Sequence, residues 1–145
     1  MAKGETETAV PFTLSSPAAS APATPLVFAP PHSGQLYPAD MRSAPDLSLA
    51  SLRSAEDGLV DRLVACGPAH GAALIAGLVS RAYVDLNRDP TELDPELVEG
   101  VEGPAGAKTA AGYGVLPPLS GDGLPLYDRR VPMSEARRGV DTVHA

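Results

Sequence analysis

The chain has few aromatic residues and a single cysteine. Its 145 residues include no tryptophan, two phenylalanines and four tyrosines, so a core must rest on alanine, valine and leucine. The one cysteine, Cys66, excludes an internal disulfide. Because Cys66 falls on an apolar position of a predicted helix, we expect a buried and unreactive thiol.

Long apolar runs and an excess of positive charge are also missing. No run approaches the roughly 18 apolar residues of a membrane span, and the polar, acidic N-terminus has no apolar signal core. We therefore expect a cytoplasmic protein without a membrane partner. The net charge of −7 disfavours a nucleic-acid partner, which requires clustered Lys and Arg. The negative net charge is compatible with a small anionic substrate, because binding of such a substrate depends on the arginines close to it.

Composition and short apolar runs suggest how the chain is organised. Residues 1–24 are rich in Ala, Ser, Thr and Pro and predict a flexible lead-in, and residues 25–145 suit one domain. Apolar runs over residues 25–30 and 72–79 predict buried strands, with 83–86 as a further candidate. A strand, a helix and a strand in this order predict a right-handed parallel unit. The expected fold is therefore α/β, with a mostly parallel central sheet and flanking helices.

Two helices are predicted from periodicity and capping patterns. Residues 51–65 carry apolar side chains at helical spacing. The segment Ser54 to Asp57 fits a capping box at the start of this helix, and Gly67-Pro68 fits its end. The second helix covers residues 134–143, with Ser134 as its N-cap.

A polar segment follows each of the two main predicted strands. Pro31-His-Ser-Gly34 comes after the first strand, and Arg81-Ala-Tyr-Val-Asp-Leu-Asn-Arg88 comes after the second. A turn after a buried strand is where α/β folds place ligands. Together the segments offer an imidazole, a carboxylate, an amide and two guanidinium groups. This set suits a metal ion and an anionic substrate.

These residues resemble the N-formylglutamate amidohydrolase family. Matching features occur in order along the chain: Pro31-His-Ser-Gly34 with Tyr37-Pro38, Glu56-Asp57-Gly-Leu-Val-Asp61, Arg81 to Arg88, and Gly112-Tyr-Gly114 followed by Pro125-Leu-Tyr127 and Glu135. The Asp-Leu-Asn-Arg core is also similar to that of zinc carboxypeptidases and aspartoacylases. The resemblance implies a zinc-peptidase-like fold. In that fold residues 25–145 would be the N-terminal part of a single amidohydrolase domain, incomplete at its C-terminus.

The resemblance also implies an activity and a cofactor. A zinc-bound water would hydrolyse N-formyl-L-glutamate, or a similar N-acyl amino acid, to formate and L-glutamate in histidine breakdown. Family members continue past the point that matches Ala145, and we expect the catalytic acid or base and a further histidine ligand there. The 145 residues alone are then expected to show no turnover. The alternative is a truncated or diverged member that binds a small carboxylate without turnover. The oligomeric state is left open.

Two residues are candidate metal ligands. His32 lies in a tight turn at a strand end, and neutral imidazole suits zinc; the alternative is a loop histidine without a role. Asp57 is the second candidate, although a carboxylate in a first helical turn is also stabilised by the helix dipole and the cap. Glu56, the neighbouring residue, is the alternative candidate for this metal ligand. The carboxypeptidase-like pattern has a glutamate three residues after its first histidine, but here that position is Gln35.

Three residues are candidates for holding the substrate carboxylates: Arg81, Asn87 and Arg88. Arginine pairs bidentately with a carboxylate, and asparagine adds a neutral donor. The alternative for each arginine is a surface ion pair with Asp85 or Asp89. We expect Asp85 to point back into the strand layer and to orient an arginine or a ligand.

Overall fold

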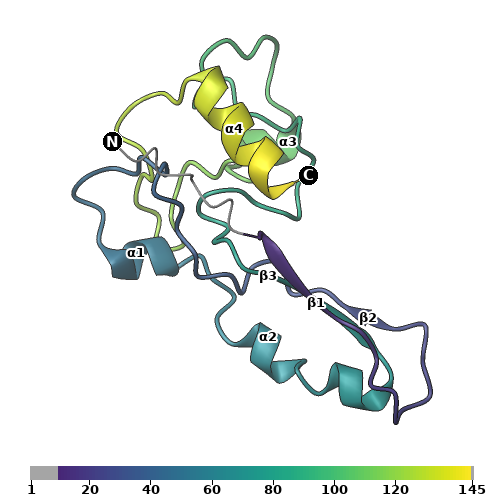
Figure 1. Cartoon of the computed structure of the whole chain (residues 1–145). Helices are drawn as coiled ribbons and strands as arrows, with labels where there is room; N and C mark the ends of the chain where they lie inside the picture. Colours follow the sequence, from purple (N-terminus) through teal and green to yellow (C-terminus); the bar gives the residue numbers. More distant parts are fainter. Residues whose placement is uncertain (1–9, 145) are drawn as a thin grey trace, which may run out of the picture.

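The computed structural model describes residues 10–144. Its elements in chain order are β1 (Phe12–Ser15), β2 (Val27–Phe28), α1 (Leu49–Arg53), α2 (Val60–Leu63), the 3-10 helix η1 (Gly67–His70), β3 (Ala73–Gly77), α3 (Ala107–Ala110) and α4 (Met133–Val143). Strands, α2 and η1 occupy one end of the molecule, and α3 and α4 occupy the other (Figure 1). None of the helices within residues 10–144 is long and apolar enough to cross a membrane.

The sheet has three strands in the order β1-β3-β2. The strands β2 and β3 are parallel, with Val27 opposite Ala73, whereas β1 pairs antiparallel with β3. The α/β class and the parallel β2–β3 pair are therefore confirmed, but the sheet is small and mixed rather than mostly parallel. Residues 83–86 form no strand. The N–H groups of Tyr83 and Val84 donate to the carbonyl oxygen of Ser80, which curls this segment into a turn.

Strand β1 lies inside the segment predicted as a flexible lead-in. Within that segment Phe12–Ser15 is an extended strand that pairs along its full length with β3. All four β1 residues are exposed. The pairing therefore depends on backbone hydrogen bonds at a sheet edge, and composition carries little signal for such a strand. The first nine residues of the predicted lead-in fall outside the described part of the chain.

The single helix predicted over residues 51–65 is wrong. Two short helices, α1 and α2, occupy this stretch, and between them Leu59 has a left-handed backbone with φ of 68°. The N-cap of α1 is Ser48, whose hydroxyl accepts from the Ser51 N–H, while Ser54 is the C-cap. The predicted apolar stripe does not form one buried face, since Leu63 is 77% exposed.

Cys66 is also not where the sequence predicted it. It directly precedes η1 and its thiol is exposed, so the expected buried position is wrong. Because α2 ends at Leu63, the helical phase that would have turned Cys66 inward is lost.

The core lies under α4, away from the sheet. It is built mainly from valines, as the scarcity of aromatic residues predicted: Val79, Tyr83, Val84, Val98, Val115, Leu116, Val131, Ala136, Val140 and Val143. The second predicted helix is confirmed as α4, although its N-cap is Pro132 and not Ser134. Gly139 lets α4 approach the core closely, because a Cβ there would lie 3.2 Å from the Tyr83 ring.

Candidate metal and carboxylate site

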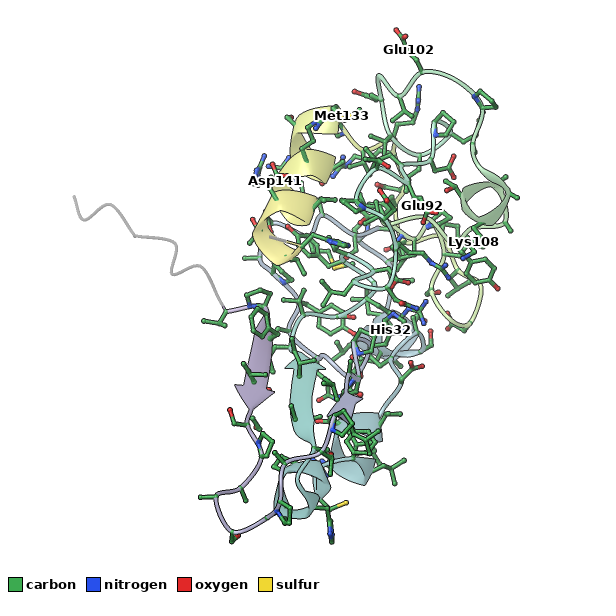
Figure 2. The ribbon with its side chains drawn as sticks, turned by 90° about the vertical axis from the view of Figure 1, so that its right-hand side faces the viewer. His32, Glu92, Glu102, Lys108, Met133 and Asp141 are labelled. Carbon is green, nitrogen blue, oxygen red and sulfur yellow. The ribbon has the colours of Figure 1, made fainter. Side chains whose placement is uncertain are left out.

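The two polar segments meet where β2 and β3 end. The Leu36 N–H donates to the Leu78 carbonyl oxygen, and the Ser80 N–H donates to the Leu36 carbonyl oxygen, both at 2.9 Å. These bonds continue the parallel pairing beyond the strands and hold the segment after β2 against the segment after β3. Figure 2 shows His32 at this junction, between the sheet and the loops of the other half. The predicted meeting of the two segments is confirmed.

Gly34 is what allows this close approach. A Cβ at Gly34 would lie 2.5 Å from the carbonyl carbon of Leu78 and closer still to the carbonyl oxygen of Val79. Both neighbours are backbone atoms and cannot rotate away. A glycine is therefore needed two residues after His32, and it fixes how the histidine turn sits on the sheet.

His32 and Asp85 form a buried pair. The Nε2 atom of His32 lies 2.7 Å from Oδ1 of Asp85, and the two residues are 8% and 2% exposed. Asp85 also accepts from the Asn87 N–H at 2.9 Å and from Nη2 of Arg81 at 2.8 Å. The prediction that Asp85 points inward and orients its neighbours is confirmed.

These contacts keep Asp85 ionised. Burial alone would raise the pKa of its carboxyl, but the hydrogen bonds from His32 and the Asn87 N–H, with the nearby positive charge of Arg81, lower the pKa to about 2. An ionised carboxylate only accepts hydrogen bonds. The 2.7 Å contact therefore assigns the ring proton to Nε2 of His32.

The other ring nitrogen of His32 faces Asp57. Its Nδ1 atom lies 3.2 Å from Oδ2 of Asp57. An unprotonated Nδ1 and a carboxylate oxygen are both acceptors, so the contact is favourable only with a proton or a cation between the two atoms. Nitrogen and oxygen ligands at about 2.0–2.2 Å from a tetrahedral zinc lie about 3.3–3.5 Å apart.

This donor set fits a zinc ion held by His32 and Asp57. Asp85 then takes the role of the carboxylate that binds the far nitrogen of a metal-bound histidine. Residues 10–144 contain no group of three or more His, Cys, Asp or Glu side chains arranged to hold a metal. The described residues thus offer two candidate ligands and a candidate orienting partner.

Asp57 is held in place by a short network from the histidine turn. Its N–H donates to the His32 carbonyl oxygen, and its own carbonyl oxygen accepts from the Ser33 hydroxyl, both at 3.0 Å. The Ser33 oxygen in turn accepts from the Asp61 N–H at 3.2 Å. Asp57 lies in a loop and caps no helix, so the helix-cap alternative is wrong. Sequence reasoning missed Ser33, although it stands next to His32 in the quoted motif.

Glu56 does not act as the fallback ligand in this arrangement. Its buried carboxylate accepts from the Tyr37 hydroxyl at 2.6 Å and from Nε of Arg53 at 3.3 Å. Burial first, and then the hydrogen bond to Glu56, raise the pKa of Tyr37 to about 12. The pair ties the histidine loop to the end of α1. Tyr37 and Glu56 both belong to the motifs quoted above, but nothing in the sequence indicates that they pair.

The three candidate carboxylate-binding residues are not equivalent. Arg81 forms an ion pair with Asp85, as the alternative for the arginines anticipated. Arg88 forms no ion pair within residues 10–144, its Nε is buried without a hydrogen-bond partner, and its guanidinium carbon lies 5.8 Å from the Tyr113 ring centre. The Asn87 side chain is exposed. Arg88 and Asn87 are therefore the candidates whose side-chain donors are available to a substrate carboxylate.

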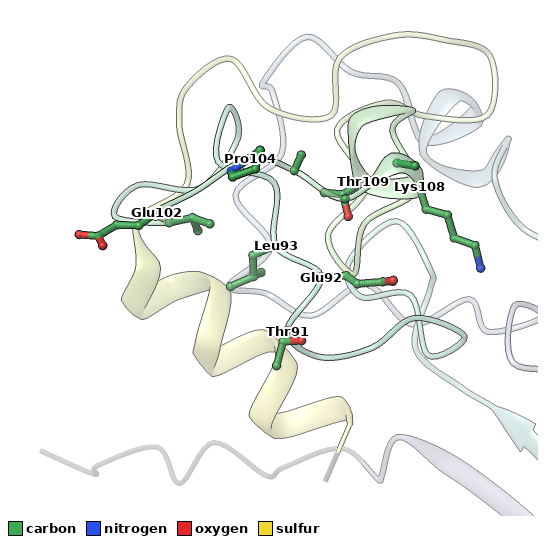
Figure 3. A pocket seen from close by; sticks show the side chains of 11 residues that line it. Thr91, Glu92, Leu93, Glu102, Pro104, Lys108 and Thr109 are labelled. Carbon is green, nitrogen blue, oxygen red and sulfur yellow. The ribbon is translucent and has the colours of Figure 1, made fainter.

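The surface also carries a hollow away from this site. It has a volume of about 360 Å³ and is lined by Thr91 to Leu93 and by residues 101, 102 and 104–109. In Figure 3 the charged ends of Glu102 and Lys108 point to opposite sides rather than into a common centre. None of the candidate ligands or arginines lines this hollow. This hollow is therefore separate from the candidate site at His32.

Comparisons with known proteins agree with the motifs. The family model of N-formylglutamate amidohydrolase matches residues 24–145. A crystal structure of N-formylglutamate amidohydrolase from Ralstonia eutropha JMP134 is similar to the chain with a TM-score of 0.80 and 36% sequence identity. The similarity covers 93% of this chain and 48% of that one, so the chain spans about half the length of that protein. No curated protein matches the sequence.

Proposed function

Because the chain belongs to the N-formylglutamate amidohydrolase family, we propose that it serves zinc-dependent hydrolysis of N-formyl-L-glutamate or a similar N-acyl amino acid, giving formate and L-glutamate. The observation that carries the proposal is the order Asp57, His32, Asp85. A carboxylate faces each ring nitrogen, and one of them is kept ionised by its own partners. That order fits a metal-bound histidine with an orienting carboxylate.

In this proposal each residue has a stated task. His32 and Asp57 would hold the zinc, which when bound polarises the amide carbonyl and lowers the pKa of a water molecule. Asp85 keeps the proton on Nε2 of His32 and so leaves Nδ1 free to bind. Arg81 holds Asp85 in place. Arg88 would bind a carboxylate of the substrate, and this positioning contributes to rate by itself.

A second candidate function is binding of a small carboxylate without turnover. It is favoured by one observation: residues 10–144 contain no set of three side chains arranged to hold a metal. A catalytic zinc site has three protein ligands and an open position for water. Formate release by these 145 residues would establish the enzyme, because a protein that only binds the ligand releases no formate.

The metal half of the proposal is tested by zinc affinity. Zinc is titrated into the 145-residue chain in competition with a chromophoric chelator. His32→Ala should weaken zinc binding by more than about tenfold, since loss even of an orienting partner costs about 10–100-fold. The matched control is His70→Ala, because His70 is exposed in η1. Unchanged zinc binding by the His32 variant would exclude this site.

The carboxylate half is tested at Arg88. Lysine keeps the charge but cannot reproduce the bidentate fork. Arg88→Lys should weaken binding of N-formyl-L-glutamate by about ten- to hundredfold, the equivalent of one charge-assisted hydrogen bond at about 1.5–3 kcal/mol. The loss should be smaller for N-formyl-L-glutamine, which lacks the side-chain carboxylate. Arg62→Lys, at an exposed position of α2, is the control. Equal binding by all three proteins would place the anion site elsewhere.

A further inference from the structure

Arg88 has an aromatic neighbour where an ion-pair partner would be expected. Its guanidinium carbon lies over the Tyr113 ring, 5.8 Å from the ring centre. A cation within about 6 Å of a ring centre is attracted by the ring face. The Tyr113 side chain is 55% exposed, so core packing does not explain why an aromatic residue stands there. The contact with Arg88 does.

The backbone fixes Tyr113 beside the loop that carries Arg88. The Tyr113 N–H donates to the Lys108 carbonyl oxygen at 2.9 Å. Two residues on, the Val115 carbonyl oxygen accepts from the Asp85 N–H at 2.8 Å. Gly112, with φ of 87°, supplies the left-handed turn that precedes the tyrosine. The ring is thus held in place by the same backbone that positions Asp85, and Asp85 is three residues before Arg88.

The choice of an aromatic neighbour has a chemical consequence. The donors of a guanidinium group lie in its plane, whereas a ring that attracts the cation through its π face takes up none of those donors. A carboxylate neighbour would instead take up the in-plane donors and neutralise the charge. The ring therefore restrains Arg88 and leaves its donors free for a bidentate ligand.

We propose that Tyr113 is a positioning residue that holds the Arg88 guanidinium ready for a carboxylate of the substrate. The inference rests on the proposed function, in which Arg88 binds that carboxylate. It assigns the effect to the ring face and not to the hydroxyl. Tyr113→Phe should therefore behave like the wild type, and Tyr113→Leu should not.

The first measurement needs no ligand. The Nε–H signal of Arg88, followed by ¹⁵N NMR of the 145-residue chain, should show a ring-current displacement in the wild type and in the Phe variant. In the Leu variant that displacement should vanish. An Arg88 signal that is unchanged in the Leu variant overturns the inference, because the ring then does not face the guanidinium in solution.

The second measurement uses glutarate, a dicarboxylate without an amide, with neutral glutaramide as the control ligand. Glutarate should bind the Leu variant about two- to fivefold more weakly than the wild type, the effect expected for one exposed cation–π contact. The Phe variant should bind as the wild type does, and glutaramide should bind to none of them. Equal glutarate binding by all three proteins, or a Phe variant as weak as the Leu variant, overturns the inference alone. A wild type that does not bind glutarate overturns the proposed carboxylate site and the inference with it.

Discussion

Replacing Asp85 by asparagine tests the arrangement of the whole site. The substitution keeps the shape of the side chain and removes its charge. The carboxylate accepts from three donors, on His32, on Arg81 and on the Asn87 backbone. An amide has one oxygen, so when that oxygen serves His32 and Asn87, its NH₂ group meets Nη2 of Arg81. Two donors then face each other in a buried place.

The loss of stability depends on how deeply the pair is buried and on the Arg81 guanidinium that is left without its partner. Breaking a buried ion pair on one side costs about 3–5 kcal/mol. The Arg81 side chain is 23% exposed, so water recovers part of that cost. We expect Asp85→Asn to lower the free energy of unfolding by about 3 kcal/mol.

The same carboxylate gives a pH dependence with a definite sign. Its folded pKa of about 2 lies below the ordinary value of 3.8, and this difference corresponds to about 2.5 kcal/mol at about 1.4 kcal/mol per pH unit. A lowered pKa stabilises the fold above about pH 4, and this contribution is lost as the pH falls towards 2. The Asn variant should not show this part of the loss of stability between pH 4 and 2.

Urea unfolding followed by circular dichroism at pH 7 and at several pH values down to 2 measures both effects. Asp141→Asn is the control, since Asp141 is exposed on α4, far from His32 in Figure 2. Its unfolding free energy should stay within about 0.5 kcal/mol of wild type. The reasoning is refuted if Asp85→Asn unfolds at the wild-type urea concentration, or if it keeps the wild-type loss of stability between pH 4 and 2.

Two further predictions concern positions outside the ion pairs. Gly34→Ala should destabilise the chain by about 3 kcal/mol or more, because backbone atoms occupy the place of the new Cβ; Gly58→Ala, with no atom within 4 Å of that place, is its control in the same urea experiment. A small loss at Gly34 would mean that the two segments do not approach each other as described. Cys66, being exposed, should react with Ellman's reagent in the folded chain nearly as fast as in urea. Strong protection in the folded chain would contradict the exposed position.

The position of the site could be predicted from the sequence because its signal is local. Each apolar run and the polar segment behind it are neighbours in the chain, and parallel strands bring their ends to one edge of the sheet. Only the pairing of β2 with β3 had to be inferred, and it is confirmed. The order of strands and polar segments is enough to predict that His32 lies beside the segment from Arg81 to Arg88.

The helix over residues 51–65 could not be corrected from the sequence, because what breaks it comes from distant residues. The Asp57 N–H donates to the His32 carbonyl oxygen, 25 residues earlier in the chain. The Ser54 hydroxyl accepts from the Asp122 N–H, 68 residues later. A serine followed three residues later by an acid fits a capping box, yet here both residues serve long-range contacts. The periodicity of residues 51–65 cannot predict either of these long-range contacts.

The same contacts explain why Asp57 and Asp85 differ although both bind His32. Asp85 is 2% exposed and accepts from three donors, so its charge is satisfied within the protein. The Asp57 side chain is 53% exposed, and its carboxylate has His32 as its one hydrogen-bond partner among residues 10–144. A buried carboxylate with three donors orients the ring, whereas an exposed carboxylate whose one partner is Nδ1 of His32 is available to a cation. In the proposed function the zinc would therefore lie on the Nδ1 side of His32, beside the exposed carboxylate of Asp57.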